Sequence, residues 1–196
     1  MRKVAIIAAF VALGVLGVGA VATADDDDGS GPNSARLNGY QEGTSLSTTG
    51  FGSFHIKINR DMTADYVLSY RDVETPVSQA HIHLGQRSVN GPVSVFLCRT
   101  TQPVPPGAQT VPQCPPTTGT VRGTITPADI ILQNPDRGIE PGNWVEFVAA
   151  VRVGHTYANV HSTRFPGGEI RGQINDRDQK EYTGPPPFAL DDSDDD

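Results

Sequence analysis

The stretch GSFHIKIN at residues 52–59 decides the fold class, because apolar and polar residues alternate along it. A period of two places Phe54, Ile56 and Ile58 on one face of an extended strand and the polar side chains on the other. A short polar turn separates this run from ADYVLSY at residues 64–70, so the two runs predict an antiparallel hairpin. Half-buried alternation is typical of an antiparallel sandwich or barrel rather than of a parallel sheet.

The rest of the domain reads as further strands joined by turns. The sequence has 21 glycines, 16 prolines and 7% aromatic residues, which suits a turn-rich β protein better than a helical bundle. Further strands are predicted at residues 35–40, 76–84, 93–97, 119–125, 156–161 and 169–174. We therefore expect a single, mainly antiparallel β-sandwich or barrel, Greek-key-like, with one or two short helices.

Two segments predict the short helices. TPAD at residues 126–129 has the form of a capping box with proline at the first helical position, so a helix is expected through Leu132. From Trp144 onward, large apolar residues recur at i, i+3, i+4 and i+7, and Gly154 suits the C-terminal cap. We interpret this apolar stripe as core packing rather than as a cofactor-binding face.

The N-terminal residues have the composition of an export signal. The basic pair Arg2-Lys3 precedes an unbroken apolar run at residues 4–22, and Ala24 ends a small-residue site that a signal peptidase would recognise. This predicts a signal peptide over residues 1–24, although an apolar run of this length would span a membrane if it were retained. We therefore expect a protein that is secreted to the extracellular space, the periplasm or the cell surface.

Acidic segments flank the predicted β domain at residues 35–175. Residues 25–34 are predicted to form an acidic disordered linker, and residues 176–196 an acidic disordered tail. The formal net charge of −7 disfavours nucleic acid and anionic membrane surfaces, because both reward clustered lysine and arginine. After signal cleavage we expect no membrane contact, and the expected partner is an extracellular protein or a cell-surface ligand.

Cys98 and Cys114 are the only cysteines in the sequence. An even pair in a chain predicted to be exported favours a disulfide. The segment between them is rich in proline and threonine, and closing a loop of that size contributes about 3 kcal/mol to stability. Two free thiols or a pair that binds a soft metal are the alternatives.

Three histidines form the candidate metal site. His81 and His83 lie two residues apart in AHIHLG, so both face the same side if that segment is extended. His161 lies in YANVH, a second strand-like stretch, and His55 on the predicted hairpin is a possible fourth ligand. Because imidazole nitrogens suit copper and zinc, this set predicts a copper or zinc site.

The histidine pattern is similar to that of the copper/zinc superoxide dismutases. Those exported β-sandwich proteins also use an H-x-H strand and a distant VH histidine, so the likeness implies redox or dismutase-like activity as an alternative function. The sequence has no equivalent of their full ligand set, which includes a bridging histidine and a zinc aspartate. The likeness is therefore an analogy.

A structural alternative uses the same histidines. Glu169 and Arg171 would face the same side of one strand, and an imidazole–carboxylate–guanidinium cluster could fix strand register without a metal. The sequence contains no G-x-S-x-G, C-x-x-C or H-E-x-x-H motif and no phosphate-cradling glycine loop. We therefore expect a protein that is not an enzyme.

Several stretches together resemble one family. They are LNGYQE at 37–42, AHIH at 80–83, NGPV at 90–93, YANVH at 157–161 and PGGEIRGQ at 166–173. In this order and spacing they resemble the CHRD domain, a module named after chordin and found in many exported bacterial proteins. The resemblance covers residues 35–175.

The resemblance implies an exported, non-enzymatic binding or structural module. In chordin the domain belongs to an extracellular protein that binds growth factors of the bone morphogenetic class. The sequence departs from the family pattern in the segment from Cys98 to Cys114 and in carrying His55 and His155. Growth-factor binding is therefore not carried over to this chain.

Overall fold

The computed structural model describes residues 33–100, 111–131 and 133–174. The predicted signal peptide, most of the predicted linker and the predicted acidic tail lie outside these residues. The first strand begins at Ser34, the last residue of the predicted linker. Within the part of the chain that the structure describes, no helix has the length and hydropathy needed to cross a membrane.

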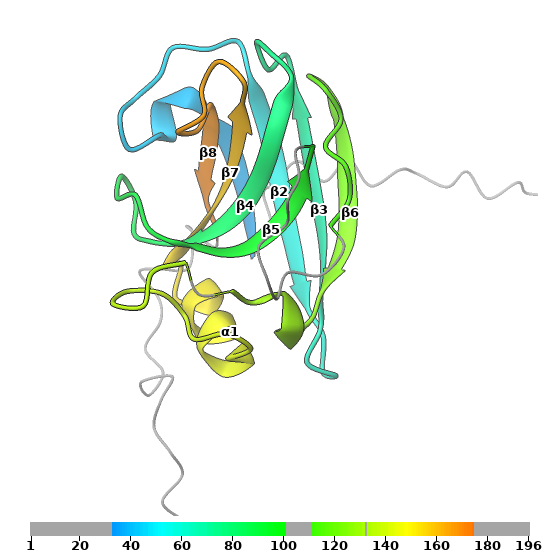
Figure 1. Cartoon of the computed structure of the whole chain (residues 1–196), viewed down its shortest axis with the longest axis vertical. Helices are drawn as coiled ribbons and strands as arrows, with labels where there is room; N and C mark the ends of the chain where they lie inside the picture. The colour runs from blue at the N-terminus through cyan, green and yellow to red at the C-terminus, as the bar shows by residue number, and fades with distance from the viewer. Residues whose placement is uncertain (1–32, 101–110, 132, 175–196) are drawn as a thin grey trace, which may run out of the picture.

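Eight antiparallel strands form one sheet that curves into a nearly closed barrel (Figure 1). The strands are β1 Ser34–Asn38, β2 Phe51–Ile58, β3 Ala64–Arg71, β4 Val77–Leu84, β5 Val93–Arg99, β6 Gly119–Ile125, β7 Thr156–Ser162 and β8 Ile170–Gln173. Their order in the sheet is β5-β4-β7-β8-β1-β2-β3-β6. The prediction of a mainly antiparallel β barrel is confirmed.

The predicted hairpin forms the centre of one half of the barrel. β2 and β3 pair with Phe54 opposite Leu68 and Ile56 opposite Tyr66. Phe54 and Ile56 are fully buried in the core, as their alternation predicted. Tyr66 also donates a hydrogen bond of 2.6 Å from its hydroxyl to the backbone oxygen of Leu97 in β5. This bond links the edge strand β5 to β3, the neighbour of the other edge strand β6, across the barrel.

The disulfide between Cys98 and Cys114 is confirmed. It joins Cys98, near the end of strand β5, to Cys114 in the segment that leads into β6. Both half-cystines are buried. Because β5 and β6 are the two edge strands of the sheet, the disulfide fastens the barrel where hydrogen bonding between strands is incomplete.

The helices differ slightly from expectation. The predicted capping box forms, with the Asp129 carboxylate accepting from the backbone N–H of Thr126 at 2.8 Å, but the 3-10 helix η2 spans only Pro127–Asp129. It ends early because the backbone N–H of Ile131 bonds to the oxygen of Ser94 in β5. Helix α1, Trp144–Arg152, is present as predicted and packs its apolar face on the core.

The first strand is shorter than predicted. β1 ends at Asn38, and a second 3-10 helix, η1, spans Gly39–Gln41. The chain turns here because the backbone oxygen of Gly39 accepts from the N–H groups of both Glu42 and Leu46. A Cβ on Gly39 would lie 2.3 Å from the oxygen of Leu46, so this close turn requires glycine.

Candidate metal centre

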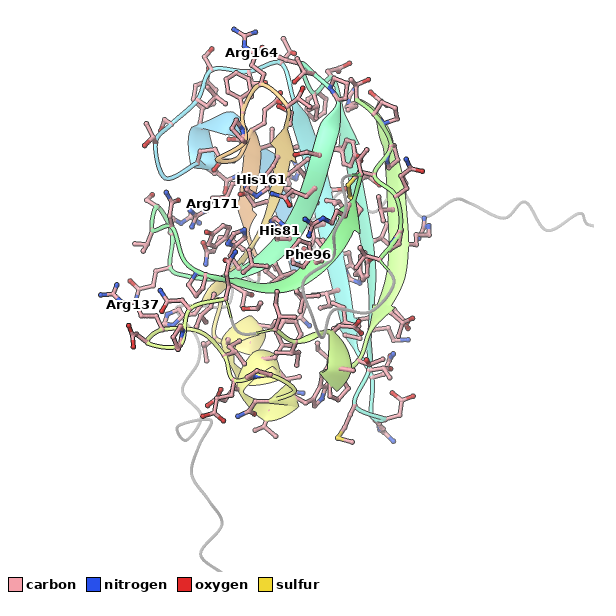
Figure 2. All side chains as sticks on the ribbon, viewed as in Figure 1. His81, Phe96, Arg137, His161, Arg164 and Arg171 are labelled. Atoms are coloured by element: carbon pink, nitrogen blue, oxygen red, sulfur yellow. A yellow bond between two sulfur atoms is a disulfide. The ribbon has the colours of Figure 1, made fainter. Side chains whose placement is uncertain are left out.

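Strands β4 and β7 are neighbours in the sheet, and their alternation places the histidines. Ala80 and Ile82 of β4 point into the apolar core, so His81 and His83 lie on the outward face of the barrel. In β7, Val160 belongs to the core and the next residue, His161, faces outward. Figure 2 shows His81 and His161 side by side on adjacent strands.

The three predicted metal-site histidines form one compact cluster. His81, His83 and His161 each offer one ring nitrogen, and these nitrogens all lie within 4.8 Å of one another. The pairing of β4 with β5 shifts register just before His81 and again just before His83. Such bulges redirect side chains, and here they flank both histidines of the H-x-H motif.

The cluster is covered although it lies on the outward face of the barrel. The exposed fractions of His81, His83 and His161 are 3%, 7% and 6%. Phe96 stands edge-on to His81 with ring centroids 4.5 Å apart, and Tyr157 stacks on His83 at 4.7 Å with an interplanar angle of 6°. The histidine nitrogens are therefore largely shielded from water.

Hydrogen bonds fix the proton positions on two of the rings. Nδ1 of His83 donates to the backbone oxygen of Gly91, and Nδ1 of His161 donates to that of Pro166, both at 2.9 Å. In a neutral imidazole the other nitrogen then carries a lone pair. Metal-ligating histidines in proteins are held in this way by a backbone oxygen or a carboxylate on the second nitrogen.

His81 completes the cluster through a contact with His161. Its Nδ1 lies 3.1 Å from Nε2 of His161, which makes Nδ1 the donor while His161 is neutral. Among the described residues, Nε2 of His81 and Nε2 of His83 have no hydrogen-bond partner. A spacing near 3 Å also suits two nitrogens that share one metal ion at bonds of about 2.0–2.1 Å.

Burial keeps all three imidazoles neutral. It lowers the pKa of His83 to about 4, with the hydrogen bond to Gly91 opposing the shift. It also lowers the pKa of His161, and it lowers that of His81 well below the ordinary value of 6.5, with the neighbouring histidines and Arg99 adding to the effect. At neutral pH the lone pairs are therefore available without proton competition.

A layered stack orients His83. The guanidinium carbon of Arg171 lies 3.5 Å from the ring centre of Tyr157, whose other face stacks on His83. The Tyr157 hydroxyl accepts from the backbone N–H of Gly91 at 3.1 Å, and the oxygen of the same glycine accepts from His83. Gly91 therefore anchors both aromatic rings.

Arg171 is almost fully buried and serves the connection between β4 and β5 rather than the histidines. It donates to the backbone oxygen of Gln86 at 2.8 Å and contacts the side chain of Asn90 at 3.4 Å. Sequence reasoning missed the roles of Tyr157 and Gly91. Tyr157 lies four residues before His161, so a period of two places both side chains on the outward face of the strand. This spacing is the one signal in the sequence that predicts a role for Tyr157 near the histidines.

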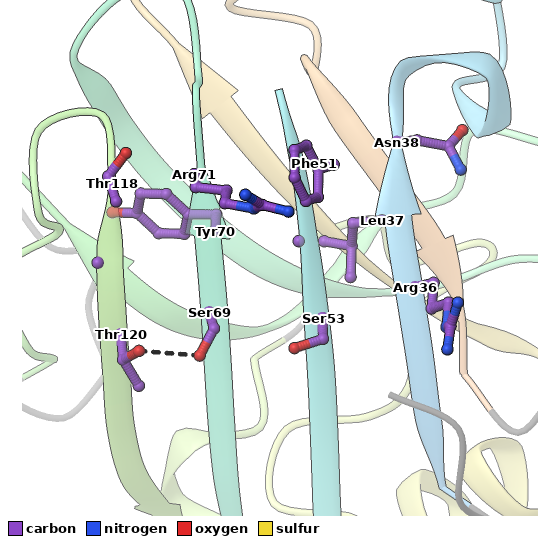
Figure 3. Close-up of a pocket in the computed structure, with 12 residues that line it drawn as sticks. Arg36, Leu37, Asn38, Phe51, Ser53, Ser69, Tyr70, Arg71, Thr118 and Thr120 are labelled. Atoms are coloured by element: carbon purple, nitrogen blue, oxygen red, sulfur yellow. Dashed lines mark hydrogen bonds between the residues drawn. The ribbon is translucent and has the colours of Figure 1, made fainter. Parts of the chain in front are cut away.

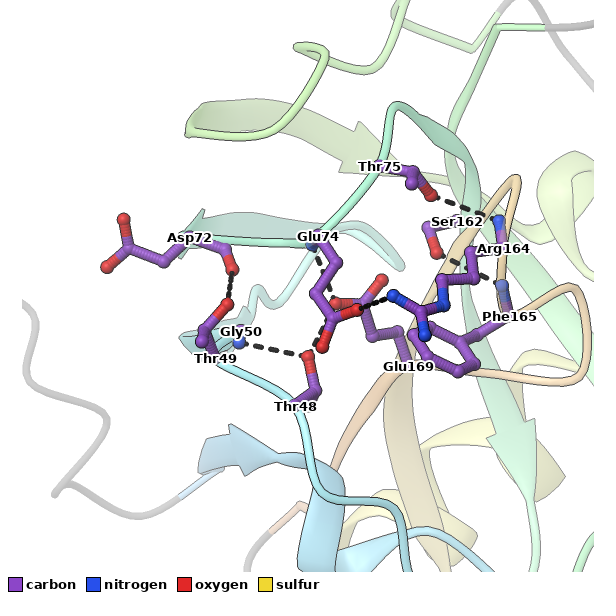
Figure 4. Close-up of polar contacts among 10 residues, drawn as sticks. All are labelled: Thr48, Thr49, Gly50, Asp72, Glu74, Thr75, Ser162, Arg164, Phe165 and Glu169. Atoms are coloured by element: carbon purple, nitrogen blue, oxygen red, sulfur yellow. Dashed lines mark hydrogen bonds and ion pairs between the residues drawn. The ribbon is translucent and has the colours of Figure 1, made fainter.

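Glu169 forms hydrogen bonds with residues outside the histidine cluster (Figure 4). Its carboxylate accepts from the hydroxyl of Thr48 at 2.7 Å and from the backbone N–H of Glu74 at 2.9 Å. The backbone N–H of Glu169 bonds to the oxygen of Val160 in β7 at 2.8 Å, just before β8 begins at Ile170. The hydrogen bonds of Glu169 and Arg171 thus run to groups other than the imidazoles.

His55 is also separate from the cluster. It lies on β2, opposite Val67 of β3, and strands β7, β8 and β1 stand between β2 and β4. The side chain faces outward on a different part of the barrel. The candidate site therefore comprises His81, His83 and His161 and does not extend to His55.

A buried acid lies close to the histidine strands. Glu42 is 8% exposed and accepts a hydrogen bond of 2.7 Å from the side-chain amide of Asn159, which lies two residues before His161. Burial raises the pKa of Glu42 to about 7, while Asn159 and Arg171 oppose the shift. A Cβ on Gly168 would lie 2.8 Å from both carboxylate oxygens, so glycine is needed beside this acid.

The fold and this site define an antiparallel β-barrel module with a buried three-histidine cluster on its outer face. The family model of the CHRD domain matches residues 33–174. The chain therefore belongs to the CHRD domain family, as its sequence motifs indicated. Comparison with curated proteins and with solved structures gave no match.

Proposed function

We propose that this chain is an exported, non-enzymatic binding module that holds one copper or zinc ion at His81, His83 and His161. One observation carries the proposal: three neutral imidazoles converge, and two of them are fixed by backbone oxygens with Nε2 turned away from those bonds. This is the ligand arrangement that transition-metal sites use.

The ligand set favours copper or zinc over other metals. Calcium and magnesium prefer carboxylate and carbonyl oxygens, whereas neutral imidazole suits copper and zinc. The cluster found among the described residues contains histidine nitrogens alone. Copper also stands highest in the general order of affinity of divalent first-row metals for such donors.

A bound copper or zinc ion would supply Lewis acidity, and copper would also supply redox chemistry. The chain itself keeps the three rings neutral by burial, and Phe96 and Tyr157 cover His81 and His83. Dismutase-like redox activity is a second candidate for the copper form, because three imidazole nitrogens suit copper, which is redox-active.

Export is supported by the disulfide and by the basic-then-apolar N-terminal sequence. Outside the cytoplasm, the module would bind an extracellular protein or a cell-surface ligand. The metal would then be part of the binding site or would stabilise the barrel wall that carries it.

Metal titration of the purified chain against a competing chelator tests the proposal. We expect one copper or zinc ion per chain, and at least about a 100-fold loss of affinity in His83→Ala and His161→Ala. His155→Ala is the matched control, because His155 is exposed and lies in the connection before β7. Equal metal binding by all four proteins would overturn the proposal.

A further inference from the structure

A groove of about 640 Å³ crosses the outer face of the barrel on β1, β2, β3 and β6 (Figure 3). These strands are adjacent in the sheet, whereas the histidine cluster lies on β4 and β7. Four neighbouring strands at about 4.8 Å spacing give the groove a length of roughly 14 Å. It is therefore an elongated surface site separate from the candidate metal centre.

The register between the strands places a row of small hydroxyl side chains on the floor of this groove. Ser53 of β2 is opposite Ser69 of β3, and Ser69 is opposite Thr120 of β6. All three face outward, because the residues beside them, such as Phe54 and Leu68, point into the core. Ser69 and Thr120 are hydrogen-bonded to each other at 2.9 Å. Arg36 of β1 is opposite Ser53 and ends the row.

The outward-facing pair next to Ser53 and Ser69 has larger side chains that border this floor. Phe51 of β2 is opposite Arg71 of β3, and the guanidinium carbon of Arg71 lies 3.8 Å from the centre of the Phe51 ring. Phe51 is 36% exposed, and Arg71 is exposed. The pair forms one wall of the groove, with a planar cation and an apolar ring side by side.

The groove is basic although the whole chain is acidic. The formal net charge is −7, yet Arg36 and Arg71 line the groove and no acidic side chain is among its lining residues. Arg122 lies in the following outward row, opposite Val67. A guanidinium presents paired donors that match a carboxylate or a sulfate. The site is therefore complementary to an anion.

We propose that this groove binds an anionic oligosaccharide, with Arg36 and Arg71 pairing its acidic groups. The hydroxyl floor can exchange hydrogen bonds with sugar hydroxyls, and the exposed ring of Phe51 can pack against the apolar face of a sugar ring. The elongated shape suits a linear polymer that is gripped along its length.

Calorimetric titration of the full chain with an alginate hexasaccharide, a polyuronate, tests the proposal. Cellohexaose is the neutral control ligand. We expect binding of the polyuronate that weakens with added salt, and no binding of cellohexaose. Arg71→Gln should weaken polyuronate binding about 10- to 100-fold, because a charge-assisted hydrogen-bonded pair is lost.

Arg60→Gln is the matched control variant, since it removes the same charge from the β2–β3 turn outside the groove. It should bind the polyuronate as the parent chain does. Equal loss in Arg60→Gln and Arg71→Gln, or equal binding of the two sugars, would overturn the proposal. Polyuronate binding that appears only after deletion of residues 176–196 would also overturn it, because the acidic tail would then be the occupant of the groove.

Discussion

Nδ1 of His81 lies 3.1 Å from Nε2 of His161, across a sequence separation of 80 residues. The contact exists because β4 and β7 pair directly and present both rings on the outer face. Either a shared proton or a shared metal ion can occupy the space between these two nitrogens. The same geometry therefore links two strands of the barrel wall and brings together ligands of the proposed metal site.

Removing His161 should destabilise the apo protein. His161→Ala leaves the buried Nδ1–H of His81 and the oxygen of Pro166 without their partner. Buried polar groups that lose a partner cost about 1–3 kcal/mol. Urea unfolding of the chelator-treated protein would measure the loss, and the exposed His155→Ala variant should stay within about 0.5 kcal/mol of the parent. A stable His161→Ala protein would argue against the contact.

Acidification should unfold the protein through the same cluster. Burial lowers the pKa of His83 to about 4, whereas an unfolded histidine titrates near 6.5, so the unfolded chain takes up protons first. The contribution of neutral His83 to the free energy of unfolding is therefore fully present above about pH 6.5. It is lost as the pH drops towards 4, by about 3 kcal/mol. Chemical unfolding of the Glu42→Gln variant at pH 7.5 and pH 5 measures the change without the opposing titration of Glu42. Equal stability at both values would contradict it.

Glu42 should act in the opposite direction. Its pKa of about 7 in the folded chain exceeds the ordinary 4.5, so its contribution is complete below pH 4.5 and is lost as the pH rises through 7. Glu42→Gln keeps an acceptor for the amide of Asn159 and removes the buried charge. We expect the variant to gain up to about 3 kcal/mol over the parent at pH 8 and little at pH 5. A gain independent of pH would show that Glu42 does not titrate in this range.

Tyr157 should act as a positioning residue for His83. Tyr157→Leu removes the ring that stacks on the imidazole, and we expect copper or zinc affinity to fall about tenfold. Tyr157→Phe keeps the ring and loses only the acceptor for Gly91, so stability should fall by about 1 kcal/mol with a smaller change in affinity. Chelator competition and urea unfolding separate the two effects. Equal affinities for the two variants would mean that the stack does not orient His83.

The disulfide should stabilise the closure of the barrel. It fastens the end of β5 to the segment before β6, the two edges of the sheet. Replacing Cys98 and Cys114 together by serine should cost about 3 kcal/mol, because the unfolded chain regains the freedom of that loop. Thermal unfolding of the parent with and without reductant gives an independent measurement. An unchanged unfolding temperature on reduction would mean that the disulfide does not stabilise the closure of the barrel.

The sequence predicted what local periodicity controls. The β2–β3 hairpin, the α1 helix and the placement of His81 and His83 on one face follow from spacing along a single segment, and the disulfide follows from the pair of cysteines. His161 was grouped with this pair from its residue type and an analogy alone, and the fold shows the contact because it depends on which strands become neighbours. The sequence placed Glu169 on the same strand face as Arg171, whereas the hydrogen bonds of Glu169 to Thr48 and Glu74 depend on how distant segments pack.

For other functional parts of the structure, no pattern along the sequence predicts their position. Glu42 follows a 3-10 turn that interrupts the expected first strand, so its burial beside Asn159 could not be derived from alternation. Gly91 acts through its backbone alone, and no side-chain pattern records that role. The groove on β1, β2, β3 and β6 likewise depends on the register between strands.

Nitrogen NMR of the histidine side chains during a zinc titration tests the central claim most directly. The account predicts that Nε2 of His83 and of His161 shift together on addition of one equivalent of zinc, with Nδ1 of both rings staying protonated and bonded to Gly91 and Pro166. His81 should shift at the same equivalence point, and His55 and His155 should not. Unchanged spectra of the three clustered rings, or shifts confined to His55 and His155, would contradict the account.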